Sequence, residues 1–179
     1  MMTLATSGDP NRVAKVGGNY VHGRIYAARP DVNAVVHSHS PSVIPFGIAK
    51  APMQACFHNA AFLAGGVPVF DIWAHYGATD MLVSDNDKGT KLAQCLADRP
   101  VALMRAHGSV ATGPSLEVAV FRAVYTEVNA RVQHWAGALA QEGEDLAVGA
   151  EHLGHGADDP APIRLRRKGE GGGAGARPG

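Results

Sequence analysis

The sequence predicts an α/β fold, because short apolar runs of strand length alternate along the chain with segments of helical periodicity. The runs lie at residues 34–36, 67–70 and 101–104. The 179 residues are the size of one domain, given ~100–200 residues per domain. Since 46% of them are hydrophobic, that domain can bury a core. We expect it to occupy residues 1–150, and we expect residues 151–179, rich in Gly, Pro and Arg, to form a disordered tail.

The first half of the chain predicts two helices on either side of one buried strand. Residues 1–18 contain a Gly-Asp-Pro-Asn turn and predict a hairpin or a loop. Apolar side chains at helical spacing then predict a helix over residues 19–29. The apolar run that leads up to His39 predicts a strand covered on both faces. Pro41, a favourable residue for a first helical turn, predicts a short helix over residues 43–49.

The second half predicts an edge strand, a helix, a hairpin and a long final helix. Pro68 cannot donate a ladder hydrogen bond, so the apolar run around it belongs at a sheet edge. Pro100 ends the helix that precedes it. The predicted elements are a strand at 67–70, a loop at 71–85, a helix at 86–97, a strand at 101–104, its hairpin partner at 109–112, and a helix from 113 to about 143.

Composition and charge exclude several classes of protein. The 16 basic and 16 acidic residues cancel, but five of the basic ones lie within residues 160–179. The rest of the chain carries 11 basic and 15 acidic residues, which disfavours nucleic acid as a partner. No run approaches the ~18 apolar residues of a membrane span, and the first ten residues lack a signal-peptide pattern. Cys56 and Cys95 form no CxxC pair, so we expect a cytoplasmic protein without a membrane partner.

Three histidines lie at the ends of predicted strands. His37 and His39 are two residues apart, so they share one face where their strand ends. His107 ends another apolar strand, and Gly108 lets the backbone turn there. Three imidazoles hold a divalent ion and leave a position open for substrate or water. The alternative is that these histidines only hydrogen-bond to solvent where the strands end.

Two further side chains are candidates for the chemistry. His58, in an apolar stretch, would bind a carboxylate or shuttle a proton, although a core or interface histidine is an equal alternative. Arg105 precedes His107 by two residues and would pair with a substrate carboxylate, the alternative being an ion pair at the surface or an interface. We expect His22 to have a packing role. Glu127 is either an exposed carboxylate or a partner that orients a ligating histidine.

Two segments resemble the central signature of the class II aldolase/adducin family. They are VHGRIYAARPDVNAVVHSH at 21–39 and LMRAHGSVATG at 103–113, the latter followed by a helix with Glu127. The resemblance implies a three-layer α/β/α fold with a central mixed, largely antiparallel sheet, and a tetramer with sites between subunits. It also implies one divalent metal ion on three histidines, which map to His37, His39 and His107. We expect zinc first, with manganese or cobalt as the alternatives.

Two departures from the family's pattern bear on the substrate. Sugar-phosphate aldolases of this family carry an acid/base glutamate four residues before the helix histidine, and that position is Gly18 here. The N-terminal helices and phosphate-binding loop of the family are also missing, which predicts an N-terminally shortened chain and disfavours phosphorylated sugars. The stretches at 37–46 and 125–131 are similar to the decarboxylase-like branch, which includes a hydroxy-methylpyridine-dicarboxylate decarboxylase.

These observations predict a metal-dependent carbon–carbon lyase for a small-molecule substrate, of the aldehyde-lyase or decarboxylase type. The metal ion would stabilise an enediolate or enolate when the bond breaks. His58 or a water would supply the proton, and Arg105 would bind the substrate. The alternative hypothesis is a non-catalytic scaffold like the adducin head, or a truncated pseudoenzyme. We expect a homo-oligomer, specifically a tetramer, because loss of an N-terminal layer would expose apolar surface.

Overall fold

A computed structural model describes the backbone of residues 2–6 and the whole of residues 20–140. The predicted tail at 151–179, the end of the last helix beyond residue 140, and Gly18 lie outside these described residues. The elements, in chain order, are β1 (Met2–Thr6), α2 (Tyr20–Ala28), β2 (Ala34–Ser38), α3 (Ile44–Ile48), the 3-10 helix η1 (His58–Leu63), β3 (Val69–Phe70), α4 (Ile72–Tyr76), α5 (Asn86–Leu96), β4 (Val101–Met104), β5 (Gly108–Gly113) and α6 (Leu116–Ala140).

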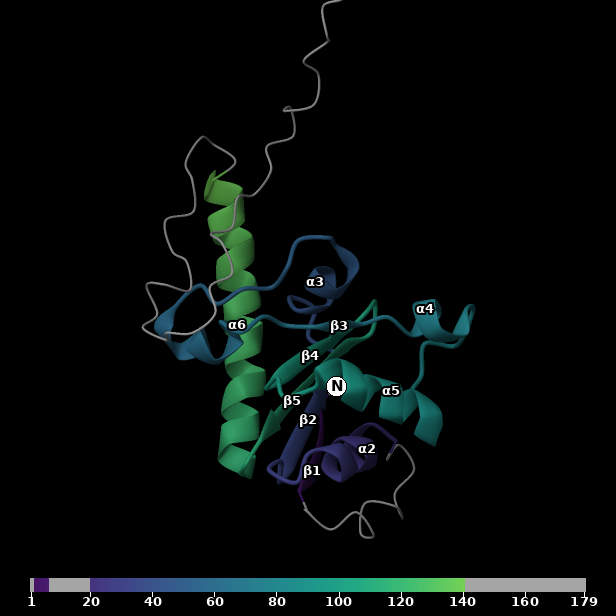
Figure 1. Cartoon of the computed structure of the whole chain (residues 1–179). Coiled ribbons are helices and arrows are strands. Elements are labelled where there is room, and N and C mark those ends of the chain that lie inside the picture. The colour runs from purple at the N-terminus through teal and green to yellow at the C-terminus, as the bar shows by residue number, and fades with distance from the viewer. Residues whose placement is uncertain (1, 7–19, 141–179) are drawn as a thin grey trace, which may run out of the picture.

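The strands form one mixed sheet with the order β1-β2-β5-β4-β3. Every neighbouring pair is antiparallel except β3 and β4, which are parallel. In the central pair His37 lies opposite Val110, and Ser38 opposite Ser109. This register places the end of β2 beside the start of β5, where the turn from β4 arrives (Figure 1).

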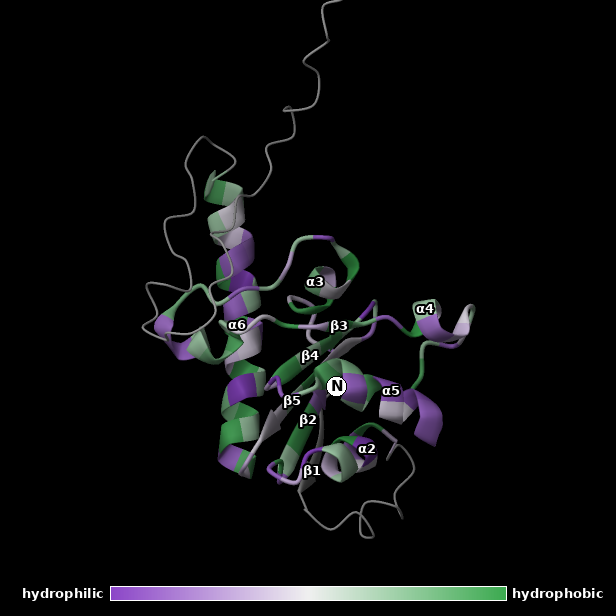
Figure 2. Cartoon of the chain, in the orientation of Figure 1, coloured by the Kyte–Doolittle hydropathy of each residue, from purple (hydrophilic) through white to green (hydrophobic). Residues whose placement is uncertain are grey.

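Helices cover both faces of this sheet, so the three-layer α/β/α prediction is confirmed. On one face Val35 and Val110 pack with the inner sides of α2 and α5, which contribute Ile25 and Leu92. On the other face α6 packs against β2 and β5, and η1 packs beside α6. Figure 2 shows β4 and the first part of β2 as hydrophobic, as expected for strands buried between two layers.

Two amide side chains of α6 bind the extended segment at 52–56, which leads into η1. Asn129 Oδ1 accepts from the Cys56 N–H at 2.8 Å, and its Nδ2 donates to the Gln54 carbonyl at 2.7 Å. Gln133 Oε1 accepts from the Gln54 N–H at 2.9 Å, and its Nε2 donates to the Pro52 carbonyl at 2.8 Å. These bonds satisfy the backbone of a segment that pairs with no strand.

The structure corrects three sequence-based expectations. Residues 2–6 form an edge strand paired with the distant β2, whereas the sequence predicts a local hairpin or a loop within residues 1–18. The predicted loop at 71–85 contains the helix α4, because Asp71 caps it by accepting from the N–H groups of Trp73 and Ala74. The sequence did not predict the helix η1 either.

None of the helices that the structure describes is long and apolar enough to cross a bilayer.

Candidate metal centre

The imidazoles of His37, His39 and His107 meet at one end of the sheet. His37 lies in β2, His39 follows its last residue, and His107 lies in the turn between β4 and β5. The Nε2 atom of His39 lies 2.9 Å from Nε2 of His37 and 3.0 Å from Nε2 of His107. One ligand atom from each ring lies within 4.8 Å of the other two. The structure thus brings together the three histidines that the sequence placed at strand ends.

The close approach of the two chain segments depends on glycine. A Cβ atom at Gly108 would overlap the carbonyl oxygen of Ser38 and lie 3.0 Å from Cδ2 of His39. Any other residue at the start of β5 would push the turn away from the end of β2. Ala106, in the same turn, has a φ of 54°, a conformation uncommon for residues other than glycine. The residue immediately before His107 therefore has a left-handed backbone conformation, which directs the turn.

Backbone carbonyls hold two of the three rings. Nδ1 of His37 donates to the carbonyl of Ser109 at 3.0 Å, and Nδ1 of His107 donates to the carbonyl of Met81 at 2.9 Å. Because a carbonyl only accepts, each Nδ1 carries a hydrogen, and the neutral form of each ring then has its lone pair on Nε2, facing the centre. Ligating histidines usually have such a partner on the second nitrogen.

The donor set fits a divalent cation. A neutral His39 carries at most one hydrogen on Nε2, so it can satisfy one of its two neighbours and not both. A cation at the centre would accept all three lone pairs at once. Around a tetrahedral zinc ion, nitrogens at ~2.0–2.1 Å lie about 3.3 Å apart, slightly wider than the 2.9 and 3.0 Å that separate Nε2 of His39 from Nε2 of His37 and of His107.

Burial keeps His37 and His39 in the neutral form that metal binding requires. The pKa of His37 is lowered to about 4, chiefly by burial and then by the nearby His107, His39 and His22 rings, against the hydrogen bond to Ser109, which raises it. The pKa of His39 is lowered as well, first by burial and then by His107. At neutral pH these two imidazoles are therefore uncharged, and no proton has to leave before a metal ion binds.

Comparison with known proteins identifies the family. The model of the class II aldolase and adducin N-terminal domain matches residues 10–134. This chain belongs to the class II aldolase/adducin family. Its relatives include the decarboxylase tropJ of Talaromyces stipitatus, 38% identical over 64% of this chain and 47% of the relative. A 3,4-dihydroxyphthalate decarboxylase of Arthrobacter keyseri is 31% identical over 65% and 49%.

A solved structure agrees with these relatives. The aldolase II superfamily protein from Pseudomonas syringae is 25% identical, with a TM-score of 0.57 over 69% of this chain and 47% of the other. This class II aldolase/adducin domain spans about half the length of the curated relatives that it matches.

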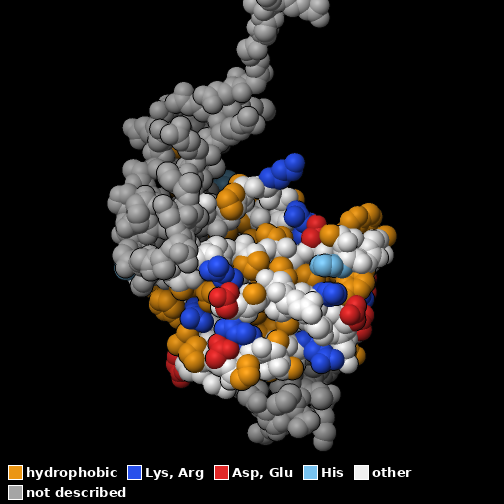
Figure 3. Space-filling model, viewed as in Figure 1, with side chains coloured by type: hydrophobic (Ala, Val, Ile, Leu, Met, Phe, Trp, Pro, Cys, Tyr) orange, Lys and Arg blue, Asp and Glu red, His pale blue; other side chains and the backbone are white. Residues whose placement is uncertain are grey.

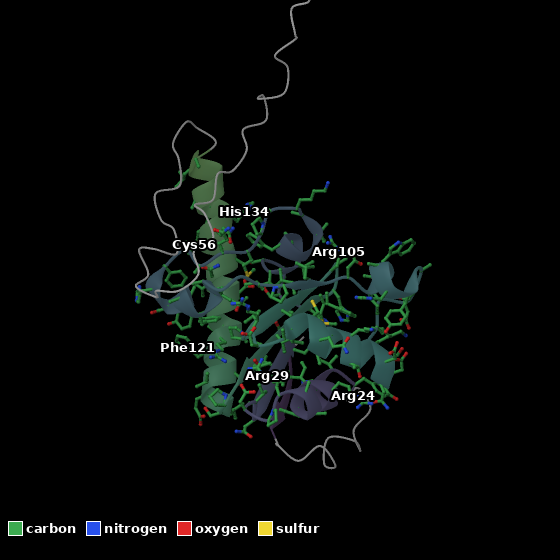
Figure 4. All side chains as sticks on the ribbon, in the orientation of Figure 1. Arg24, Arg29, Cys56, Arg105, Phe121 and His134 are labelled. Atoms are coloured by element: carbon green, nitrogen blue, oxygen red, sulfur yellow. The ribbon has the colours of Figure 1, made fainter. Side chains whose placement is uncertain are left out.

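Arg105 already contacts two other residues of the chain. Its Nε lies 2.6 Å from a carboxylate oxygen of Asp71, and its Nη1 donates to the carbonyl of Ile48 at 3.4 Å. Figure 4 shows Arg105 on the side of the sheet where α3 and α4 lie. Of the two alternatives from the sequence, the structure shows the ion pair, and a contact to substrate stays a prediction.

His58 lies away from the three imidazoles within one chain. It is the first residue of η1, is exposed, and its ring is 6.0 Å from that of Phe57, centroid to centroid. The helix η1 belongs to the layer of α6, whereas His37 extends from the sheet face that it shares with Val35. The catalytic role of His58 therefore stays a prediction, and it requires a site shared between subunits.

The other two candidates from the sequence, His22 and Glu127, have packing and ion-pair roles. His22 is 4% exposed on α2, which agrees with the packing that we expected of it. Glu127 pairs with Arg131 at 3.3 Å along α6. The carbonyls of Ser109 and Met81, which hold two of the rings, were missed from the sequence, since a backbone acceptor leaves no mark on residue type.

Proposed function

We propose that this class II aldolase/adducin domain is a metal-dependent carbon–carbon lyase that decarboxylates a hydroxylated carboxylic acid, such as a dihydroxyphthalate. The convergence of three imidazole nitrogens at one end of the sheet carries the proposal. The family supports a lyase, and the two decarboxylases among the relatives support loss of carbon dioxide.

The histidines supply the binding site for the ion. His37, His39 and His107 would hold zinc, or manganese or cobalt, since three imidazoles select weakly among these ions. A divalent ion bound there stabilises the negative charge that develops on the substrate oxygens as the carbon–carbon bond breaks. The same charge develops in retro-aldol cleavage, so the ligands alone do not distinguish the two reactions.

The remaining groups would orient the substrate and move the proton. Arg105 would bind the substrate carboxylate with the donors that Asp71 leaves free. When carbon dioxide leaves, its bonding electrons stay on the substrate carbon, and a proton must replace it there. His58 of a second subunit, or a water, would supply that proton.

We also propose that the domain acts as a homo-oligomer, a tetramer, in the cytoplasm. Large apolar side chains are exposed on α6, with exposed fractions of 44% for Phe121, 60% for Trp135 and 68% for Leu139. A second subunit would cover them. Figure 3 shows cations and anions intermixed on the viewed face of the described residues, with no field of one sign. Cys56 and Cys95 are free thiols, as suits a reducing compartment.

The test is metal content together with turnover. The wild type should bind about one divalent ion per chain and release carbon dioxide from 3,4-dihydroxyphthalate with added zinc or manganese. His37→Ala and His107→Ala should lose both, whereas His134→Ala, an exposed histidine on α6, should lose neither (Figure 4). Strong cleavage of sugar phosphates would overturn the decarboxylase assignment. Absence of metal, with the histidine variants unchanged, would replace the enzyme with an adducin-like scaffold.

A further inference from the structure

The two rings that backbone carbonyls hold are anchored to different kinds of structure. The Ser109 carbonyl that holds His37 belongs to β5, which is paired on both sides within the sheet. The Met81 carbonyl that holds His107 belongs to the segment between α4 and α5, outside the sheet. The position of His107 therefore depends on how that segment folds.

Met81 has an unusual backbone conformation. Its φ is 65°, in the left-handed region that residues with a Cβ rarely adopt. Its partly buried side chain packs against the core cluster that α2 and α5 share. The direction of the Met81 carbonyl follows from this φ, so a change to the common right-handed region would turn it away from His107.

Side-chain oxygens of the two residues before Met81 stabilise this conformation. The hydroxyl of Thr79 accepts from the Met81 N–H at 3.0 Å. The carboxylate of Asp80 accepts from the Leu82 N–H at 3.0 Å. Each bond closes a small turn, and together they satisfy the two N–H groups on either side of the left-handed residue. The Thr79 bond is the one made to Met81 itself.

We propose that Thr79 is a positioning residue for His107: its hydroxyl holds Met81 in the left-handed conformation, and the Met81 carbonyl then holds the hydrogen of His107 on Nδ1. Nε2 of His107 is thereby kept unprotonated and aimed at His39. The consequence for metal binding rests on the proposed function, whereas the consequence for the ring hydrogen does not.

The experiment compares Thr79→Val, which removes the acceptor at constant shape, with Thr79→Ser, which keeps it. Metal affinity is measured by competition with a chelator. Thr79→Val should bind zinc about 10- to 100-fold more weakly, as is typical when the partner of a ligating histidine is lost. Thr79→Ser should restore the wild-type affinity. Thr90→Val is the matched control, because the Thr90 hydroxyl binds only its own helix, at the Asn86 carbonyl.

A second readout needs no metal. In the metal-free protein, ¹⁵N chemical shifts should show the His107 hydrogen on Nδ1 in the wild type and Thr79→Ser, and a mixture of tautomers in Thr79→Val. Adding Met81→Gly to Thr79→Val should restore the Nδ1 form, since glycine adopts the left-handed conformation without help. An unchanged tautomer in a folded Thr79→Val overturns the inference. Should the wild type bind no metal, the proposed function fails and the tautomer measurement alone decides the role of Thr79.

Discussion

Asp71 and Arg105 form a 2.6 Å ion pair just beyond the ends of the two parallel strands, β3 and β4. The backbone joins the same two places, since the Arg105 N–H donates to the Phe70 carbonyl at 2.9 Å. The other oxygen of Asp71 caps α4. One carboxylate therefore ties the start of α4 to the turn that carries His107.

Replacing Asp71 should separate its two roles. Asp71→Asn keeps an oxygen for the cap and removes the charge, so it should cost less than about 1 kcal/mol, as for other partly exposed ion pairs. Asp71→Ala removes the cap as well and should cost about 1 kcal/mol more. Urea unfolding of both variants measures the difference. Equal losses would mean that the cap contributes nothing.

Placing a methyl group at Gly108 should disrupt the metal centre. Gly108→Ala puts a Cβ atom against the Ser38 carbonyl, so the turn must move away from β2. We expect a loss of about 2 kcal/mol or more, in the range for overpacked sites, together with weaker zinc binding. Gly23→Ala is the control, because its Cβ would meet nothing within 4 Å. In the helix α2 it should stabilise by up to about 1 kcal/mol. Calorimetry with and without zinc checks both, and tight zinc binding by Gly108→Ala would contradict the geometry.

The metal-free domain should lose stability as the pH falls. The pKa of His37 is lowered to about 4 in the folded chain, from 6.5. Between these pH values His37 binds a proton in the unfolded chain but not in the folded chain. Its contribution to the free energy of unfolding is therefore complete above pH 6.5 and lost as the pH falls toward 4. The lowered pKa values of His22 and His39 act in the same direction. Melting temperatures from pH 7 to pH 4 should fall less steeply in His37→Gln than in the wild type. Parallel curves would show that His37 takes up its proton equally in both states.

The amide side chain of Asn129 on α6 should contribute measurably to the free energy of unfolding. Asn129→Ala leaves the Cys56 N–H without its partner and the Gln54 carbonyl with only the Cys56 thiol, at 3.4 Å, so it should cost about 1–3 kcal/mol. Asn129→Asp keeps the acceptor for Cys56 and loses the donor to Gln54. Its free energy of unfolding, from urea titration, should fall between the wild type and Asn129→Ala. The opposite order would indicate that burying a charge outweighs the bond that is kept.

Much of the fold and the three histidines could be predicted, since periodicity and strand ends are local signals. His37 and His39 share a face because the side chains of a strand alternate, and His107 follows an apolar run as clear as theirs. The pairing of Arg105 with Asp71 could not be predicted, because the partners are 34 positions apart and their contact depends on the parallel strands. The helix α4 has five residues, too few to show a helical period. The edge strand β1 could not be chosen over a loop, because its partner is fixed only by the sheet.

The amides at positions 129 and 133 make one side of a helix behave like the edge of a sheet. Four helical residues rise about 6 Å, and two residues of an extended segment advance about 6.6 Å. The repeat from Asn129 to Gln133 thus matches the spacing of the backbone groups at 52, 54 and 56. Inserting or deleting a single residue within 52–56 would turn the backbone donors and acceptors to the wrong side. The segment 52–56 can therefore change in length only by two residues at a time, although it is neither helix nor strand.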